Sequence, residues 1–433
     1  MSDPGLVLCS RRVVTPEGVR AASVHLSNDT ILRIAGWNDR APGATVVDYE
    51  NFVIMPGLVD THVHVNEPGR TEWEGFATAT RAAAAGGVTT ILDMPLNCIP
   101  PTTTAAALGA KRAALDGQAV VDVAFIGGVV PGNLDNLAEL AGAGVRAFKC
   151  FLSPSGVDEF PAVSENDLRA AFPVLARLGL PLMVHAEDPA RLRPPPPGGS
   201  RRYATYLASR PPGAEREAIA LLVRLMDECP TPVHVVHLSS AQSLDTIRSA
   251  RARGLPLSVE TCPHYLTFAA EDIPDGATEF KCAPPIRGRL ERDGLWDALI
   301  RGEIDLVASD HSSCPPALKN SDGDFFAAWG GIASLQLSLS AVWTGARARG
   351  MAPERLAGWM SSSPARLAGL AGRKGRLAAG YDADIVVWDP DASFSVDASR
   401  LEHRHAVTPY AGRELFGVVR ATYVSGKKVS EDI

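Results

Sequence analysis

The sequence holds few cysteines and no pairing motif for them. Its 433 residues include only seven cysteines, and none of these forms a Cys-x-x-Cys pair. An odd number of scattered thiols does not suit a disulfide framework, so we expect reduced cysteines and a cytoplasmic location. Long apolar runs are also missing, and Met1–Gly5 has no basic residue leading into an apolar stretch. We therefore expect no membrane span, no membrane partner and no signal peptide.

An excess of basic residues is absent as well. Lys and Arg together number 42 against 49 Asp and Glu, which gives a formal net charge of -7. This balance argues against nucleic acid as the main partner. Hydrophobic residues make up 46% and charged residues 21%, which is typical of a globular protein. The length allows one large core and a smaller module.

Both ends of the chain have the pattern of antiparallel β-structure. Short apolar runs such as Leu6–Leu8 and Val13–Val14 are separated by turn residues near the start, and Asp384–Trp388 is similar near the end. Two β-rich ends that flank a different middle predict one discontinuous β-sandwich. We assign its first part to residues 1–54 and its second part, with the tail, to residues 373–433.

The middle of the chain, residues 55–372, alternates apolar strands with helical segments. After the first strand, which ends near residue 64, seven more are predicted at Val88–Met94, Val121–Ile126, Val145–Leu152, Pro181–His185, Pro232–Leu238, Leu257–Thr261 and Ile304–Ser309. The order favours an α/β fold with a closed (β/α)8 TIM-like barrel. A doubly wound parallel sheet is the alternative.

Two segments of this region carry further expectations. The helix that begins after Ser164 has a capping-box pattern, and Pro173 inside it predicts a kink or a break. The proline-rich segment Arg191–Pro212 is either an exposed loop, which is the simpler interpretation, or a lid over the active face.

The motif Asp60-Thr61-His62-Val63-His64 closes the first predicted strand. Residues i and i+2 of a strand point to the same face, so the two imidazoles lie side by side and could bind a transition metal. Asp60 lies on that face too, where it could orient a histidine. An isolated His-x-His pair is a weak signal, because such pairs are often ordinary polar residues.

Four further candidates lie near the ends of other predicted strands, namely Lys149, His185, His237 and Asp310. Catalytic groups of a barrel project from the carboxyl ends of its strands. A single buried histidine such as His185 is more often a hydrogen-bonded core residue, and His234 keeps that interpretation. Six candidates at five strand ends instead predict one common site.

Lys149 stands among apolar neighbours on a strand that we expect to be buried. Burial lowers the pKa of a lysine and makes the neutral amine available. A neutral amine can capture carbon dioxide as a carbamate, giving N6-carboxylysine, whose two oxygens can bridge two cations. Together with the four histidines and Asp310, it predicts a centre for two divalent metal ions, with zinc as the expected metal.

Such a centre produces a bridging hydroxide at neutral pH and polarises a carbonyl for its attack. Asp310 is placed to take the proton of the hydroxide and pass it to a leaving nitrogen, as general base and then general acid. The predicted reaction is hydrolysis of an amide-type bond without a covalent intermediate.

The motifs together resemble those of the cyclic amidohydrolases, a branch of the amidohydrolase superfamily that includes hydantoinases, dihydropyrimidinases, dihydroorotases and allantoinases. The sequence is most similar to the allantoinases, over nearly its whole length. The resemblance rests on Asp60–His64, Asn66–Arg70, Met94–Asn97, Phe148–Phe151, Lys281–Arg287, Ser309–Pro316, Ala328–Ala333 and Pro409–Arg413.

The resemblance implies a homotetrameric enzyme that opens allantoin to allantoate in purine breakdown. It also divides the ligands, with His62, His64, Lys149 and Asp310 on one metal, and Lys149, His185 and His237 on the other. The implied substrate contacts are Asn66, Arg70, Asn97, His264, Ala283, Cys314 and Gly331.

Some positions separate the branches of this group. Dihydroorotases carry an arginine at the position of Asn66 and a histidine at that of Cys314, and both changes fit a substrate without a carboxylate. Ala283 stands where allantoinases usually have a serine. The alternatives are a hydantoinase or dihydropyrimidinase and a non-catalytic scaffold, which the six filled metal positions disfavour.

Overall fold

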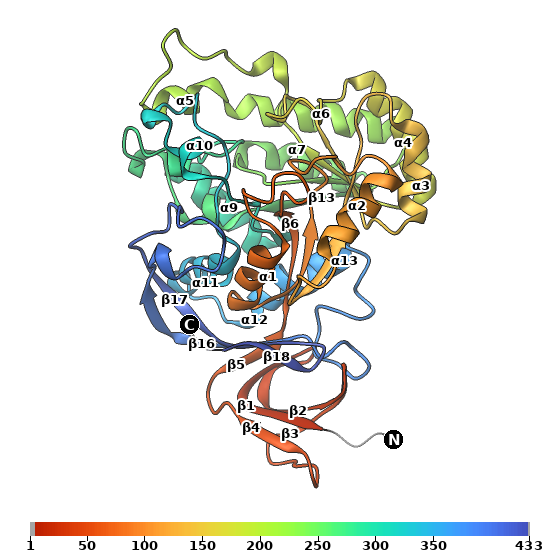
Figure 1. Ribbon diagram of the computed structural model, residues 1–433, viewed down its shortest axis with the longest axis vertical. Helices are drawn as coiled ribbons and strands as arrows, with labels where there is room; N and C mark the ends of the chain where they lie inside the picture. The colour runs from red at the N-terminus through yellow and green to blue at the C-terminus, as the bar shows by residue number, and fades with distance from the viewer. Residues whose placement is uncertain (1–4, 432–433) are drawn as a thin grey trace.

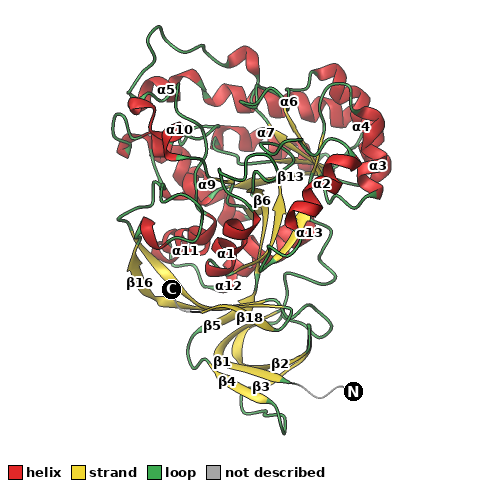
Figure 2. Cartoon of the chain, viewed as in Figure 1, coloured by secondary structure: helices red, strands yellow, loops and turns green. Residues whose placement is uncertain are grey.

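In a computed structural model, which describes residues 5–431, a (β/α)8 barrel stands on a β-sandwich (Figure 1). Helices surround the barrel strands, whereas the sandwich is made of strands and loops (Figure 2). Across residues 5–431, no helix is both long and apolar enough to cross a membrane. The expectation of no signal peptide at Met1–Gly5 falls mainly on residues outside the described range.

The barrel strands run parallel, as the βαβ order predicts. They are β6 (Leu58–His64), β7 (Val88–Asp93), β8 (Asp122–Phe125), β9 (Gly127–Gly128), β10 (Phe148–Phe151), β11 (Leu182–His185), β12 (Val233–Val235), β13 (Leu257–Thr261), β14 (Leu306–Val307) and β15 (His311–Ser312). Their hydrogen bonds follow the orders β15-β6-β7-β8 and β14-β13-β12-β11-β10-β9. The two sheets meet where β9 follows β8 and where β15 follows β14 in the chain, which closes the barrel.

The helices lie mainly in the connections between barrel strands (Figure 2). They are α1 (Phe76–Ala85), α2 (Ala105–Leu115), α3 (Leu137–Gly142), α4 (Glu165–Leu178), α5 (Tyr203–Ser209), α6 (Pro212–Glu228), α7 (Leu244–Ala252), α8 (Pro263–Thr267), α9 (Arg289–Arg301), α10 (Pro316–Asn320), α11 (Ser338–Ala348), α12 (Glu354–Ala357) and α13 (Ser363–Leu367).

Helix α4 continues through Pro173, so the predicted break is wrong. Its first turn is closed by a capping box between Ser164 and Asp167, and its end by Gly179 in the left-handed conformation. Leu168 and Phe172 are buried on its apolar face. Both caps and this buried face compensate for the hydrogen bond that a proline inside a helix removes.

The sandwich joins both ends of the chain in one eight-stranded sheet. Its strands are β1 (Leu6–Thr15), β2 (Gly18–Ser27), β3 (Thr30–Gly36), β4 (Thr45–Asp48), β5 (Val53–Pro56), β16 (Ile385–Ser395), β17 (Glu414–Val424) and β18 (Lys427–Glu431). The antiparallel pairing of β5 with β16 connects the two ends, with Ile54 opposite Val387. The two short strands predicted around Leu6–Val14 form a single strand, β1, with an irregularity between Ser10 and Val13.

The segment Arg191–Pro212 is not simply an exposed loop. It contains α5, whose Tyr203 and Tyr206 are buried. Their hydroxyl groups donate hydrogen bonds to the carbonyls of Ile286 at 2.8 Å and Cys282 at 2.7 Å. These bonds hold the second half of the segment against the barrel and bring it to the cavity at the active face.

Two barrel strands end earlier than the sequence predicts. Strand β12 ends at Val235 and β14 at Val307, before His237 and Asp310. Both later residues leave the extended conformation, with φ of 41° at His237 and 48° at Asp310. The chain therefore turns at these residues and directs both side chains toward the carboxyl end of the barrel.

Candidate active site

All six predicted metal ligands border one cavity of about 480 Å³ at the carboxyl ends of the barrel strands. They are His62 and His64 on β6, Lys149 on β10, His185 at the end of β11, His237 after β12 and Asp310 before β15. They come from five separate parts of the chain, and closure of the barrel brings them together.

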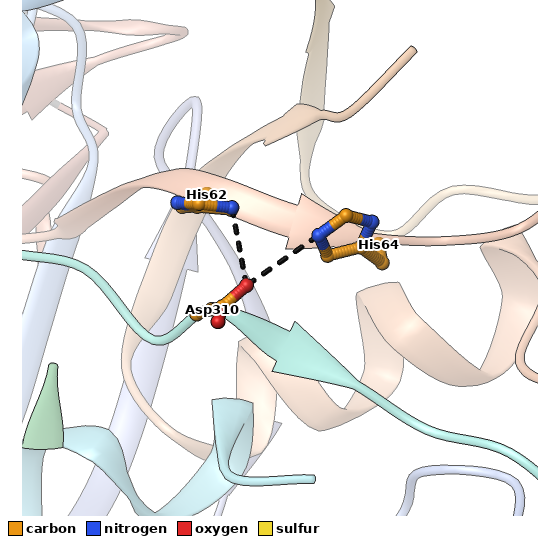
Figure 3. A group of neighbouring side chains, drawn as sticks. All are labelled: His62, His64 and Asp310. Atoms are coloured by element: carbon orange, nitrogen blue, oxygen red, sulfur yellow. Dashed lines mark ion pairs between the residues drawn. The ribbon is translucent and has the colours of Figure 1, made fainter. Parts of the chain in front are cut away.

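His62, His64 and Asp310 form the first group (Figure 3). Nε2 of His62 lies 3.1 Å and Nε2 of His64 3.4 Å from Oδ1 of Asp310. The two imidazoles project from the same face of β6, as the period of two predicts. Burial lowers the pKa of His64 to about 4, so its ring is neutral at pH 7 and has a lone pair for a cation.

His185 and His237 form the second group. Nδ1 of His185 lies 3.0 Å from Nε2 of His237, and Nε2 of His185 lies 2.8 Å from Oε2 of Glu187. Because the carboxylate of Glu187 can only accept a hydrogen bond, Nε2 of His185 carries its proton and Nδ1 keeps a lone pair. Burial lowers the pKa of both rings, and that of His237 well below its ordinary value.

Lys149 is fully buried between these groups and lies 4.9 Å from the ring centroid of Phe151. Its Nζ has no hydrogen-bond partner among residues 5–431. A buried ammonium without a partner is costly, and burial lowers the pKa of Lys149 to about 8. About a tenth of the side chains are therefore free amines at pH 7, far more than for an ordinary lysine.

Glu260 on β13 is a functional candidate that was not predicted from the sequence. Its Oε1 lies 2.6 Å from Nδ1 of His62, and its Oε2 lies 2.9 Å from Nε2 of His234. Burial alone would raise the pKa of Glu260, but His62 and His234 lower it to about 2. The carboxylate thus fixes the tautomer of His62 and leaves Nε2 free to face Asp310. An acidic residue inside an apolar strand was the available signal.

Asp60 does not orient a histidine ring, contrary to the hypothesis from its position. Its carboxylate accepts hydrogen bonds from the backbone N–H of His62 at 3.1 Å and of Ser309 at 3.2 Å. It therefore ties the end of the first barrel strand to the segment that leads into Asp310. His234 is a core residue, as expected, because it bonds to Ser258 and Glu260.

Three polar residues that line the cavity, and Asn66 two positions after His64, have a left-handed backbone. The φ angles are 69° at Asn66, 67° at Asn97, 41° at His237 and 48° at Asp310. Such conformations are uncommon outside glycine and cost free energy, so they persist where the surrounding structure enforces them. Their concentration here is typical of a functional site.

Three of the predicted substrate contacts, Asn97, Ala283 and Gly331, line the cavity. The Nδ2 atom of Asn97 lies 3.3 Å from Nδ1 of His64. The backbone of Gly331 is close to Ser312, since a Cβ atom at this glycine would lie 2.5 Å from the Ser312 hydroxyl oxygen. Only main-chain groups can therefore border the cavity at Gly331.

The other four predicted contacts, which are Asn66, Arg70, His264 and Cys314, are not among the lining residues. Asn66 donates to the carbonyl of Ser313, and Arg70 pairs with Glu159. His264 is buried within reach of Asp310, and both its ring nitrogens lack a hydrogen-bond partner among the described residues. Cys314 is buried.

Comparison with known proteins places this constellation in a family. A model of the amidohydrolase family matches residues 53–194 and 201–429. The chain belongs to the amidohydrolase family. The resemblance and the fold inferred from the sequence are thereby confirmed.

Named relatives within the family are also similar over nearly the full length. The chain is 52% identical to an allantoinase of Streptomyces avermitilis, covering 100% of this chain and 97% of that one. Identity to an allantoinase of Arabidopsis thaliana is 42%, over 98% and 87% of the two chains. The solved structure of an L-hydantoinase from Arthrobacter aurescens superimposes with a TM-score of 0.94 at 31% identity, over 99% and 96% of the chains.

Proposed function

We propose that the protein is a metal-dependent hydrolase that opens the ring of allantoin to give allantoate. The observation that carries this proposal is the convergence of four histidines, Lys149 and Asp310 on one cavity. The ring substrate is supported by relatives named allantoinase at 42% and 52% identity. Asn66 and Cys314 support it as well, because neither supplies a cation for a substrate carboxylate.

The donor set fits two divalent cations. His62, His64 and Asp310 would hold one and His185 and His237 the other, with Lys149 carboxylated and shared by both. This assignment is supported by the neutral imidazoles and by Nζ of Lys149, which has no hydrogen-bond partner within residues 5–431. Nitrogen-rich sites with carboxylate-type oxygens suit zinc. Bound there, the cations would supply a hydroxide at neutral pH and polarise the substrate carbonyl.

Asp310 carries the proton in this reaction. Surrounding imidazoles hold its pKa well below the ordinary value despite its burial, so it begins as a carboxylate. It accepts the proton of the attacking oxygen as the new C–O bond forms. It then donates that proton to the amide nitrogen as the C–N bond breaks, which releases a carboxylate and an amine-type nitrogen.

Replacing Glu260 by glutamine is expected to weaken metal binding. The amide keeps the size of the side chain but cannot accept strongly from both His62 and His234. Loss of such a partner of a ligating histidine costs about 10–100-fold in metal affinity or activity. Titration of the metal-free protein with zinc measures this effect. Glu303→Gln, which alters an exposed ion pair with Arg248 and Arg301, is the matched control.

A panel of four ring compounds tests the proposed substrate. We expect kcat/KM for allantoin to exceed that for hydantoin, dihydrouracil and dihydroorotate by at least about a hundredfold, because a site built for a ureido arm leaves polar groups unpaired with the simpler rings.

All four compounds are measured at equal enzyme and metal concentrations, together with elemental analysis of the protein. A preference for hydantoin or dihydrouracil would assign the chain to the hydantoinase branch, which the L-hydantoinase structure keeps as the second candidate. An active sample without metal would refute the metal centre itself.

We also propose a domain division, a set of substrate contacts, a location and an oligomeric state. The barrel, residues 55–372, would carry the chemistry, flanked by sandwich segments 1–54 and 373–433. Asn97, Ala283 and Gly331, which line the cavity, would contact the substrate, and Asn66, Arg70, His264 and Cys314 would lie behind this lining. A cytoplasmic location is supported by the seven free cysteines. A homotetramer is proposed from the family resemblance, and sedimentation of the purified protein would test it.

A further inference from the structure

One wall of the cavity is a loop without regular structure. It runs from Phe326 to Gly331 and is followed by Ile332, which forms a single β-bridge with His311. All six of its residues line the cavity. A loop has no ladder of hydrogen bonds to fix its backbone, so its carbonyl groups must find other partners. Two lysines supply them.

Lys319 donates hydrogen bonds to the second half of this loop. Its Nζ donates hydrogen bonds to the carbonyls of Lys281 at 2.9 Å and Trp329 at 3.0 Å, and to the carbonyl of Gly331. The side chain is only 3% exposed. The N–H of Gly331 also donates to the carbonyl of Lys281 at 2.8 Å. Lys281 and Gly331 are thus hydrogen-bonded to each other, and the Lys319 ammonium also donates to the carbonyl of each.

Lys281 holds the first half of the same loop. Its Nζ donates to the carbonyl of Phe326 at 3.3 Å and to that of Ala328. It also lies 5.5 Å from the ring centroid of Tyr206, which belongs to α5. Lys281, Tyr206 and the loop all line the cavity. This lysine thus connects α5 and the loop, two segments that border the cavity.

Neither ammonium group has a carboxylate within ion-pair distance in residues 5–431. Two other buried lysines do, since Lys111 pairs with Asp93 at 2.6 Å and Lys374 with Asp384. Burial lowers the pKa of Lys281 and of Lys319 to about 8. Carbonyl oxygens accept the hydrogen bonds of both ammonium groups, so the positions of the carbonyls and of the ammonium groups depend on each other.

We propose that Lys281 and Lys319 are positioning residues that hold the Phe326–Gly331 wall so that it contacts the substrate in one orientation. This inference rests on the proposed function for the identity of the substrate. The wall borders the cavity and takes no part in proton transfer. We call the hydrogen bonds of the two lysines to this loop the clamp. Its loss should weaken binding of the ground state and of the transition state alike.

Lys319→Met and Lys281→Met test the proposal in the metal-loaded protein. We expect KM for allantoin to rise by about tenfold or more while kcat changes by less than about threefold, the signature of lost uniform binding. Metal content should stay at the wild-type level. Hydrogen exchange of peptides that cover residues 325–335 should become faster, without a change in the barrel strands.

Lys281→Arg and Lys374→Met are the matched controls. The arginine can still donate to both loop carbonyls, so its KM should stay within about threefold of wild type. Lys374→Met removes a buried lysine that lies beside the sandwich and does not line the cavity, so it should lower the melting temperature without changing KM. An unchanged KM in Lys319→Met, or activity lost only in proportion to bound metal, would overturn the proposal.

Two outcomes need a second measurement to be decisive. If Lys319→Met does not fold, Lys281→Met decides, because Lys281 lies closer to the surface. If the wild-type protein binds metal but does not hydrolyse allantoin, the proposed function fails. Hydrogen exchange at residues 325–335 then tests, without an activity assay, whether the two lysines hold the loop. Unchanged exchange in both methionine variants would refute it.

Discussion

Lys149→Ala is expected to lose about a hundredfold to a thousandfold in kcat, the scale of losing a major charge-stabilising group. Without the amine no carbamate can form, so the two cations would lose their shared ligand. The fold should survive, because removing a buried amine that has no hydrogen-bond partner among residues 5–431 leaves no other described polar group unpaired. Activity and metal content of the purified variant are the measurements.

Two comparisons make this test specific to the carbamate. Lys149→Arg keeps a positive charge but cannot take up carbon dioxide, so it should be as inactive as the alanine variant. Short-chain acids added to Lys149→Ala should restore part of the activity by replacing the carbamate oxygens. If Lys149→Ala retains both metals and full activity, Lys149 is not a shared ligand.

Asp310→Asn should reduce kcat by at least about a thousandfold as well, since it removes a charged group that also moves the proton. The asparagine amide has nearly the same shape as the carboxylate, but it does not accept a proton near neutral pH. It also carries no negative charge to face the two imidazoles. His62 and His64 would lose the carboxylate that lies 3.1 and 3.4 Å from their Nε2 atoms. Binding of allantoin should persist, and calorimetry with slow turnover can measure it.

Asp305→Asn is the matched control for this variant. Asp305 directly precedes β14, at the opposite end of the same barrel strand, and it accepts a hydrogen bond from the N–H of Val259 at 2.7 Å. It does not line the cavity. We expect kcat within about twofold of wild type for Asp305→Asn, because surface substitutions away from a site have small effects. An Asp310→Asn variant with wild-type kcat would exclude the proposed proton transfer.

The sequence alone was sufficient for the barrel and for the six metal-ligand candidates. Eight apolar strands that alternate with helices commonly form a closed (β/α)8 barrel. Polar residues at the carboxyl ends of its strands then meet at one face. The period of two in a strand is enough to predict that His62 and His64 lie side by side. The lone lysine among apolar neighbours at position 149 indicated burial, and the structure buries it fully.

Local patterns were less reliable where tertiary contacts override them. Pro173 predicted a kink or a break, yet two caps and a buried face keep α4 continuous. Asp60 has the spacing of a histidine partner, but its carboxylate is occupied by two backbone N–H groups. In each case the sequence identified a residue with a special role, and only the neighbours decided what that role is.

The residues that support the site could be found only in the folded chain. Glu260 lies 198 positions from His62 in the sequence, and Lys319 lies 38 positions from Lys281. No periodicity connects residues so far apart, because side-chain hydrogen bonds depend on the path of the backbone in space. Strand ends and residue types determined which groups form the site, whereas barrel closure and the left-handed turns at His237 and Asp310 decided where those groups point.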